Sequence, residues 1–136
     1  MNPFTKHTMA SALLLSCLSM SGAAQAHHSW ALYDLPTCKV IEGTVRTFEW
    51  NFPHTWLWVY VPNAKGGQDI WGFQGEPPSN LSEHGWTNTT LKKGDKIKIK
   101  FSPLKDGRNG GAMSQVTLPT GKVMIGPRGG ADVCAK

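Results

Sequence analysis

Two adjacent histidines, His27 and His28, directly follow the small-residue segment Ala24-Gln25-Ala26. A cut after Ala26 would make His27 the first residue, with a free α-amine beside its imidazole. These two groups can chelate one metal ion, and His28 adds a second imidazole. Nitrogen-rich, tetragonal ligation suits Cu(II), which also leads the affinity order of the divalent metals. The α-amine, with a reference pKa near 7.7–8.0, loses its proton readily at neutral pH, so these residues predict a copper site.

A third histidine, His54, is the candidate that completes this site. Pro53 fixes the backbone directly before it, so His54 is expected at a strand junction and not on a freely moving loop. The predicted metal ligands are therefore His27, His28 and His54. Two other interpretations stay open: a solvated terminus that binds copper only adventitiously, and a His54 ring packed among tryptophans.

Six tryptophans are many for a chain of 136 residues. Three of them, Trp50, Trp56 and Trp58, are candidates for a ligand pocket. Trp56 and Trp58 lie on one face of a predicted strand, because successive side chains alternate between faces. Exposed rings would form a pocket for a small apolar or aromatic ligand, whereas buried rings would belong to the core. Exposed aromatic rings also bind single strands of nucleic acid, but an exported protein is not expected to meet nucleic acid.

Two classes of function follow from these residues. The first is a periplasmic metal-binding protein, with copper as the metal. The second is a non-metal binding module that holds a small organic ligand or docks on an exported or membrane-bound protein. The sequence has no Cys-x-x-Cys, His-Glu-x-x-His or Gly-x-Ser-x-Gly motif, and we do not expect an enzyme.

The first 26 residues have the pattern of a secretory signal peptide. Lys6 precedes an apolar stretch over residues 9–20, and small residues follow up to Ala26. The apolar stretch is too short to span a bilayer as a helix. We therefore expect removal of residues 1–26 and a periplasmic or secreted protein. A retained anchor and lipidation at Cys17 are the alternatives.

Processing at this position removes Cys17 and leaves two cysteines, Cys38 and Cys134. Two cysteines in an exported domain favour one disulfide. We therefore predict a bond between Cys38 and Cys134, with two free thiols as the alternative.

Residues 27–136 are predicted to form a single all-β domain with one short helix. The chain is 40% hydrophobic and 17% charged, with 15 Gly and 9 Pro, which excludes a disordered polyelectrolyte and disfavours a helical bundle. We expect strands at residues 39–50, 55–61, 68–74, 96–101 and 112–118. A short helix over residues 80–84, capped by Ser79, is expected between the third and fourth strands, and a small hairpin at residues 121–124. The domain is flanked by a lead-in (27–38) and a tail (126–136). Lys96, Lys98 and Lys100 are expected to form a solvated face that protects a sheet edge. Three strands, a helix and two strands are the element order of a five-stranded OB-like barrel, and an open β-sandwich is the alternative.

Several segments together resemble the bacterial DUF6152 family of small exported proteins. They are Ala26-His27-His28-Ser29, Glu42-Gly43-Thr44-Val45, Pro53-His54-Thr55-Trp56, Gly85-Trp86, residues 91–95 and residues 103–107. The resemblance covers almost all of the chain after residue 26, and it implies an exported β-barrel without supplying an activity. The family pattern usually has Asn-Pro-His, whereas Phe52 here separates Asn51 from Pro53.

The mature protein is expected to begin at His27, because Ala24 and Ala26 occupy the two small-residue positions of a signal-peptidase site. The intact mass of the exported protein measures this directly. A mass that corresponds to a lipidated Cys17 terminus or to the full chain would contradict the prediction and would remove the amine ligand.

Overall fold

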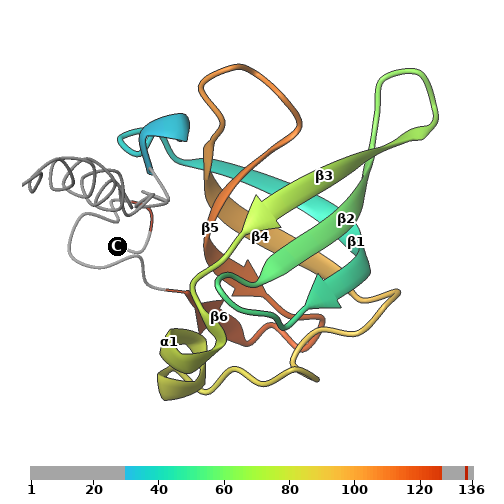
Figure 1. The fold of residues 1–136 in the computed structure, drawn as a ribbon. Helices are drawn as coiled ribbons and strands as arrows, with labels where there is room; N and C mark the ends of the chain where they lie inside the picture. Colours follow the sequence, from blue (N-terminus) through green and yellow to red (C-terminus); the bar gives the residue numbers. More distant parts are fainter. Residues whose placement is uncertain (1–29, 127–133, 135–136) are drawn as a thin grey trace, which may run out of the picture.

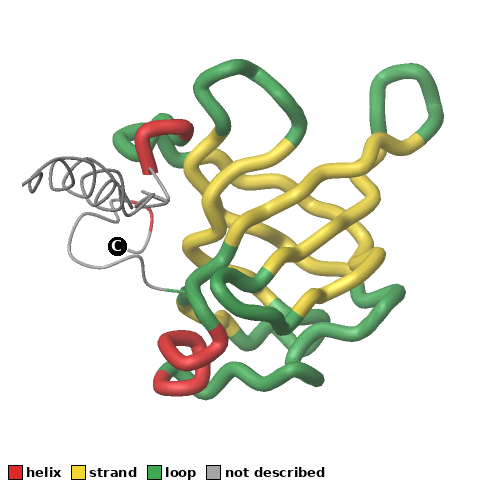
Figure 2. Tube along the Cα trace, viewed as in Figure 1, coloured by secondary structure: helices red, strands yellow, loops and turns green. Residues whose placement is uncertain are grey.

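The computed structural model describes residues 30–126 and residue 134. Its elements, in chain order, are the 3-10 turn η1 (Trp30–Leu32), β1 (Lys39–Glu49), β2 (Trp56–Pro62), β3 (Gln68–Gln74), α1 (Pro78–Glu83), β4 (Lys96–Pro103), β5 (Gly110–Thr117) and β6 (Val123–Ile125). The described part of the chain is therefore mostly β, as expected, and the strands make up its body (Figure 2). Within this part, no helix is long and apolar enough to cross a membrane.

Strands β1 to β5 close into a barrel (Figure 1). The long β1 pairs antiparallel with both β2 and β4, β2 pairs with β3, and β4 pairs with β5. A parallel pairing of β3 with β5, in which Gly72 is opposite Gly110, closes the ring. The resulting order 1-2-3-5-4, with α1 between β3 and β4, confirms the OB-like barrel and excludes the open sandwich. The short β6 extends β5 as a hairpin.

Alternation along the strands divides core from surface as the sequence predicts. In β2, Leu57 and Val59 are fully buried, while Trp56 and Trp58 on the other face are only half-buried. In β4, the isoleucines and Phe101 point into the core. Burial of such side chains contributes roughly 1.5–3 kcal/mol each, so the core of the barrel holds β2 with its two tryptophans on the outside.

Two details of the sequence interpretation are wrong. The helix begins at Pro78 and not after a Ser79 cap, because proline is favoured at the first helical position, and no side chain caps the helix by a hydrogen bond. The three lysines of β4 do not protect an edge, since β4 pairs with a strand on each side. Their side chains still alternate with buried residues, and Lys98 forms an exposed ion pair of 3.1 Å with Glu42.

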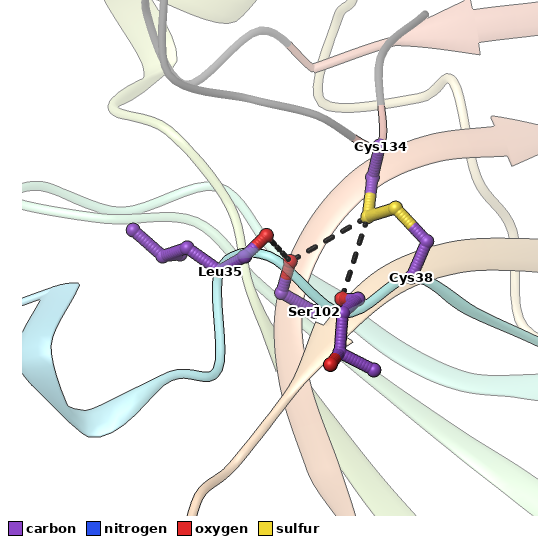
Figure 3. The surroundings of a disulfide bond; sticks show 5 residues. Leu35, Cys38, Ser102 and Cys134 are labelled. Carbon is purple, nitrogen blue, oxygen red and sulfur yellow. Dashed lines mark hydrogen bonds between the residues drawn. A yellow bond between two sulfur atoms is a disulfide. The ribbon is translucent and has the colours of Figure 1, made fainter.

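The predicted disulfide between Cys38 and Cys134 is confirmed, with the two Cα atoms 5.4 Å apart. Cys134 is fully buried, and its Sγ lies 3.5 Å from the hydroxyl oxygen of Ser102 on β4. That hydroxyl also donates to the carbonyl of Leu35 at 3.3 Å (Figure 3). The bond therefore joins residue 134 to the segment that leads into β1.

Replacing Cys134 by serine should lower the free energy of unfolding by about 2–5 kcal/mol. The bond closes a sequence separation of 96 residues, for which the chain-entropy model gives up to about 4.7 kcal/mol. Urea unfolding of the wild type, with and without reductant, against Cys134→Ser measures the loss. Reduction should destabilise the wild type alone, and equal sensitivity of both proteins to reductant would contradict the prediction.

Candidate functional site

The loop that carries His54 is firmly anchored between β1 and β2. Thr55, directly after His54, is fully buried, and its hydroxyl donates to the carbonyl of Glu76 at 2.9 Å. The carbonyl of Thr55 accepts a hydrogen bond of 2.9 Å from the backbone N–H of Gly75. These bonds join the loop to the segment after β3, so His54 is held at a strand junction as the sequence predicts.

The His54 ring lies against Trp30, the first described residue. The two ring centroids are 6.5 Å apart and their planes meet at 70° in an edge-on contact. Trp30 also contacts Tyr33, with centroids 5.8 Å apart. His54 is half-buried and its Nδ1 is buried. His54 therefore packs beside Trp30, the residue that directly follows residues 27–29 in the sequence.

The turn η1 is itself fixed to the barrel. Tyr33 is buried, and its hydroxyl donates to the side-chain carbonyl of Gln74 on β3 at 2.8 Å. The backbone N–H of Asp34 donates to the carbonyl of Pro103, and the carbonyl of Leu32 accepts from Lys105. Contacts to both β3 and the end of β4 hold Trp30 in place beside His54.

Two of the three predicted copper ligands, His27 and His28, lie outside the described residues. Over residues 30–126 and 134, no group of three or more His, Cys, Asp and Glu side chains is arranged to hold a metal ion. The remaining described histidine, His84, ends α1, where its Nδ1 lies 3.0 Å from the carbonyl of Asn80. His84 is exposed and belongs to a different part of the barrel from η1.

A hollow of about 330 Å³, which we call the aromatic groove, lies on the outer face of β2 and β3. Its main lining residues come from the end of η1, from these strands and from the β4–β5 loop: Leu32, Tyr33, Trp56, Trp58, Gln74, Leu104 and Arg108. The Trp56 and Trp58 rings stack with centroids 5.6 Å apart and planes 15° apart. The third predicted pocket residue, Trp50, lies elsewhere and packs against Phe48.

The backbone of β3 makes room for the Trp58 ring. Gly72 is directly opposite Trp58, and a Cβ atom at Gly72 would lie 2.5 Å from the indole. The Trp58 Nε1–H donates to Glu49 at 3.0 Å. The indole is therefore fixed from two sides.

The β4–β5 loop places the guanidinium of Arg108 at the groove, and Asp106 of the same loop neutralises its charge. Asp106 accepts hydrogen bonds from the backbone N–H of Arg108, at 3.1 Å, and from its Nε–H, at 2.7 Å. These two bonds stabilise the carboxylate and hold the pKa of Asp106 below its ordinary value. Both side chains are exposed, so the pair sits in water at the mouth of the groove.

The family model for DUF6152, a family of unknown function, matches residues 14–114. The chain belongs to this family. The matched part includes His27, His28, His54 and the whole lining of the aromatic groove. Comparisons with curated proteins and with solved structures gave no match.

Sequence reasoning missed several residues of both sites in this family member. Trp30 and Tyr33 fall in the lead-in, which has no strand period, and Gln74 and Arg108 carry no motif. Only the alternation of β2 and the turn-forming Gly107 after Asp106 gave local signals. The contacts of Trp30 with His54 and of Tyr33 with Gln74 join positions 24 and 41 apart in sequence.

Replacing Gly72 by alanine should displace the Trp58 ring and cost about 1–3 kcal/mol of stability, because the new methyl group collides with the indole. The indole signal of Trp58 in a ¹H–¹⁵N spectrum and urea unfolding measure both effects. Gly67→Ala, where the new Cβ would meet nothing closer than 3.6 Å, is the matched control. An unmoved Trp58 signal in Gly72→Ala would contradict the packing described.

Proposed function

We propose that the protein binds copper in the periplasm through His27, His28 and His54, after removal of residues 1–26. The observation that carries this proposal is the ring contact between Trp30 and His54. It places the described start of the chain beside the loop histidine, although 24 positions separate the two residues.

Chain length supports the rest of the site. His28 is two residues before Trp30 and His27 is three residues before it. A fully extended chain spans at most about 3.6 Å per residue, so the Cα of His27 lies within ~11 Å of the Cα of Trp30. This length of chain allows the side chains of both histidines to reach the His54 ring without any movement of η1.

The donor set has the chemistry of a copper site. The α-amine of a processed His27 and the imidazoles supply nitrogen ligands, which favour Cu(II) in tetragonal geometry. Copper must displace protons from these groups, so binding is coupled to proton release. The anchored β1–β2 loop holds His54 before metal arrives, which reduces the ordering cost of binding.

Protein purified with the native His27 terminus should bind one Cu(II), and a form whose His27 α-amine is acetylated should bind at least tenfold more weakly. Acetylation converts the amine into an amide and removes the chelate ring. His54→Ala should also lower the affinity at least tenfold, because an imidazole ligand is lost. Competition with a chromophoric chelator measures these affinities, and electron paramagnetic resonance counts the nitrogen ligands.

The matched control is His84→Ala, since His84 is exposed and far along the chain from the proposed ligands. Its copper affinity should equal that of the wild type. Circular dichroism of each variant checks that the barrel is intact. Equal copper affinity of the native and Nα-acetylated proteins would refute the proposed site.

A further inference from the structure

We propose that the aromatic groove binds a saccharide, of the class of β-1,4-linked glucose or N-acetylglucosamine oligosaccharides. This site is separate from the proposed copper ligands, and the inference does not depend on copper binding. It rests on the shape of the aromatic surface, on the polar groups around it and on the local charge.

The floor of the groove is formed by two stacked indoles. The Trp56 and Trp58 rings lie within 15° of parallel, on the outer face of β2. A pyranose ring with equatorial hydroxyls presents axial C–H groups on its two faces, and these pack on an aromatic ring. Because Trp56 and Trp58 stack on each other, one pyranose ring can pack on the outer side of this pair, and the next β-1,4-linked ring extends toward the polar groups around the groove.

The floor is also preorganised. Trp58 is fixed by its hydrogen bond to Glu49 and by the close approach of Gly72, and Trp56 stacks on Trp58. Rings that are already ordered lose little conformational freedom when a ligand lands on them, which favours affinity. Ligand binding therefore carries little free-energy cost for ordering the two indoles.

Polar side chains surround the aromatic floor. Gln74 accepts the Tyr33 hydroxyl through its carbonyl oxygen, so its amide N–H₂ group can donate to a ligand. Arg108 uses Nε–H for Asp106 and keeps its terminal N–H₂ groups for other acceptors. Asn109 lines the same groove. An apolar floor with a few donors at its border suits a ring that carries hydroxyls on its edge.

Local charge favours a neutral saccharide over a single strand of nucleic acid. Arg108 is the cation among the described lining residues, and Asp106 neutralises it at 2.7 Å. Glu49 adds a carboxylate beside Trp58. The three lysines of β4 lie on a strand that β1 separates from β2. Nucleic-acid grooves combine stacking with a positively charged track for phosphates, and this groove has no such track in the described chain.

The groove also lies where this barrel architecture offers a binding face. OB folds bind oligosaccharides and oligonucleotides on the face of strands 2 and 3, bordered by the β1–β2 and β4–β5 loops. Here Trp56, Gln74 and Arg108 come from β2, β3 and the β4–β5 loop. A volume of about 330 Å³ is near the lower end for small-molecule pockets, which fits a short oligosaccharide. The lining residues, and not the shared fold, set the ligand class.

The test is a ¹H–¹⁵N titration of the mature protein with chitotriose and with cellotriose, in metal-free buffer with a chelator. At least one trisaccharide should shift the indole signals of Trp56 and Trp58 at about 10 mM, where a ligand with a Kd of ~1 mM is near saturation. Trp56→Ala should weaken binding at least tenfold, and Arg108→Ala about threefold. His54→Ala should leave it unchanged, which separates this site from the copper site.

Trp50→Ala is the matched control, because Trp50 is a half-buried tryptophan outside the groove, and it should bind the trisaccharide as the wild type does. If Trp56→Ala does not fold, the exposed Arg108→Ala and a Gln74→Ala variant decide the question. Undisturbed indole signals with both trisaccharides would overturn the proposal. So would wild-type affinity in the groove variants, or preferential binding of single-stranded oligo(dT) at the same indoles.

Discussion

The parallel approach of β3 and β5 is the constraint on which this barrel depends. Gly72 and Gly110 lie opposite each other at that seam, and a Cβ atom on Gly110 would collide with the carbonyl oxygen of Gly72. Gly110 also has a φ of 152°, which L side chains rarely adopt. Closure at this point leaves no room for a Cβ atom at Gly110. On its outer side, the same bare backbone at Gly72 receives the Trp58 ring, so barrel closure and the aromatic groove share one residue.

Much of the fold follows from local sequence signals. Alternation in β2 and β4 gave the correct inward and outward faces, because the period of two is a property of any extended chain with one buried side. The segment Gln68–Gln74 has the bounds that its turn residues predict. The start of α1 was less predictable, because serine is favoured at the N-cap and proline at the first helical position. The sequence alone does not show which of Ser79 and Pro78 marks the start of the helix, which begins at Pro78.

The sites were less predictable because they depend on contacts between distant parts of the chain. Nothing near Trp30 indicates that its ring meets His54, and nothing near Tyr33 indicates that its hydroxyl meets Gln74. Trp50 has the same kind of sequence neighbours as Trp56 and Trp58. The chain turns between Trp50 and Trp56, however, and Trp50 packs against Phe48. Tyr33 links the two sites, because it contacts Trp30 and lines the aromatic groove. A ligand in the groove and an ion at His54 would thus be neighbours through one buried tyrosine.

The Cys38–Cys134 bond turns the barrel into a covalent ring, since the six strands of the described chain lie between the two cysteines. A single backbone cut in any surface loop, such as residues 104–109, would open that ring without releasing a fragment. The two pieces would stay tethered at high effective concentration, so the strands on either side of the cut could pair again. Nicked protein would migrate as one species in electrophoresis until the disulfide is reduced. The disulfide therefore lets the barrel keep both pieces of the chain after a cut in a surface loop.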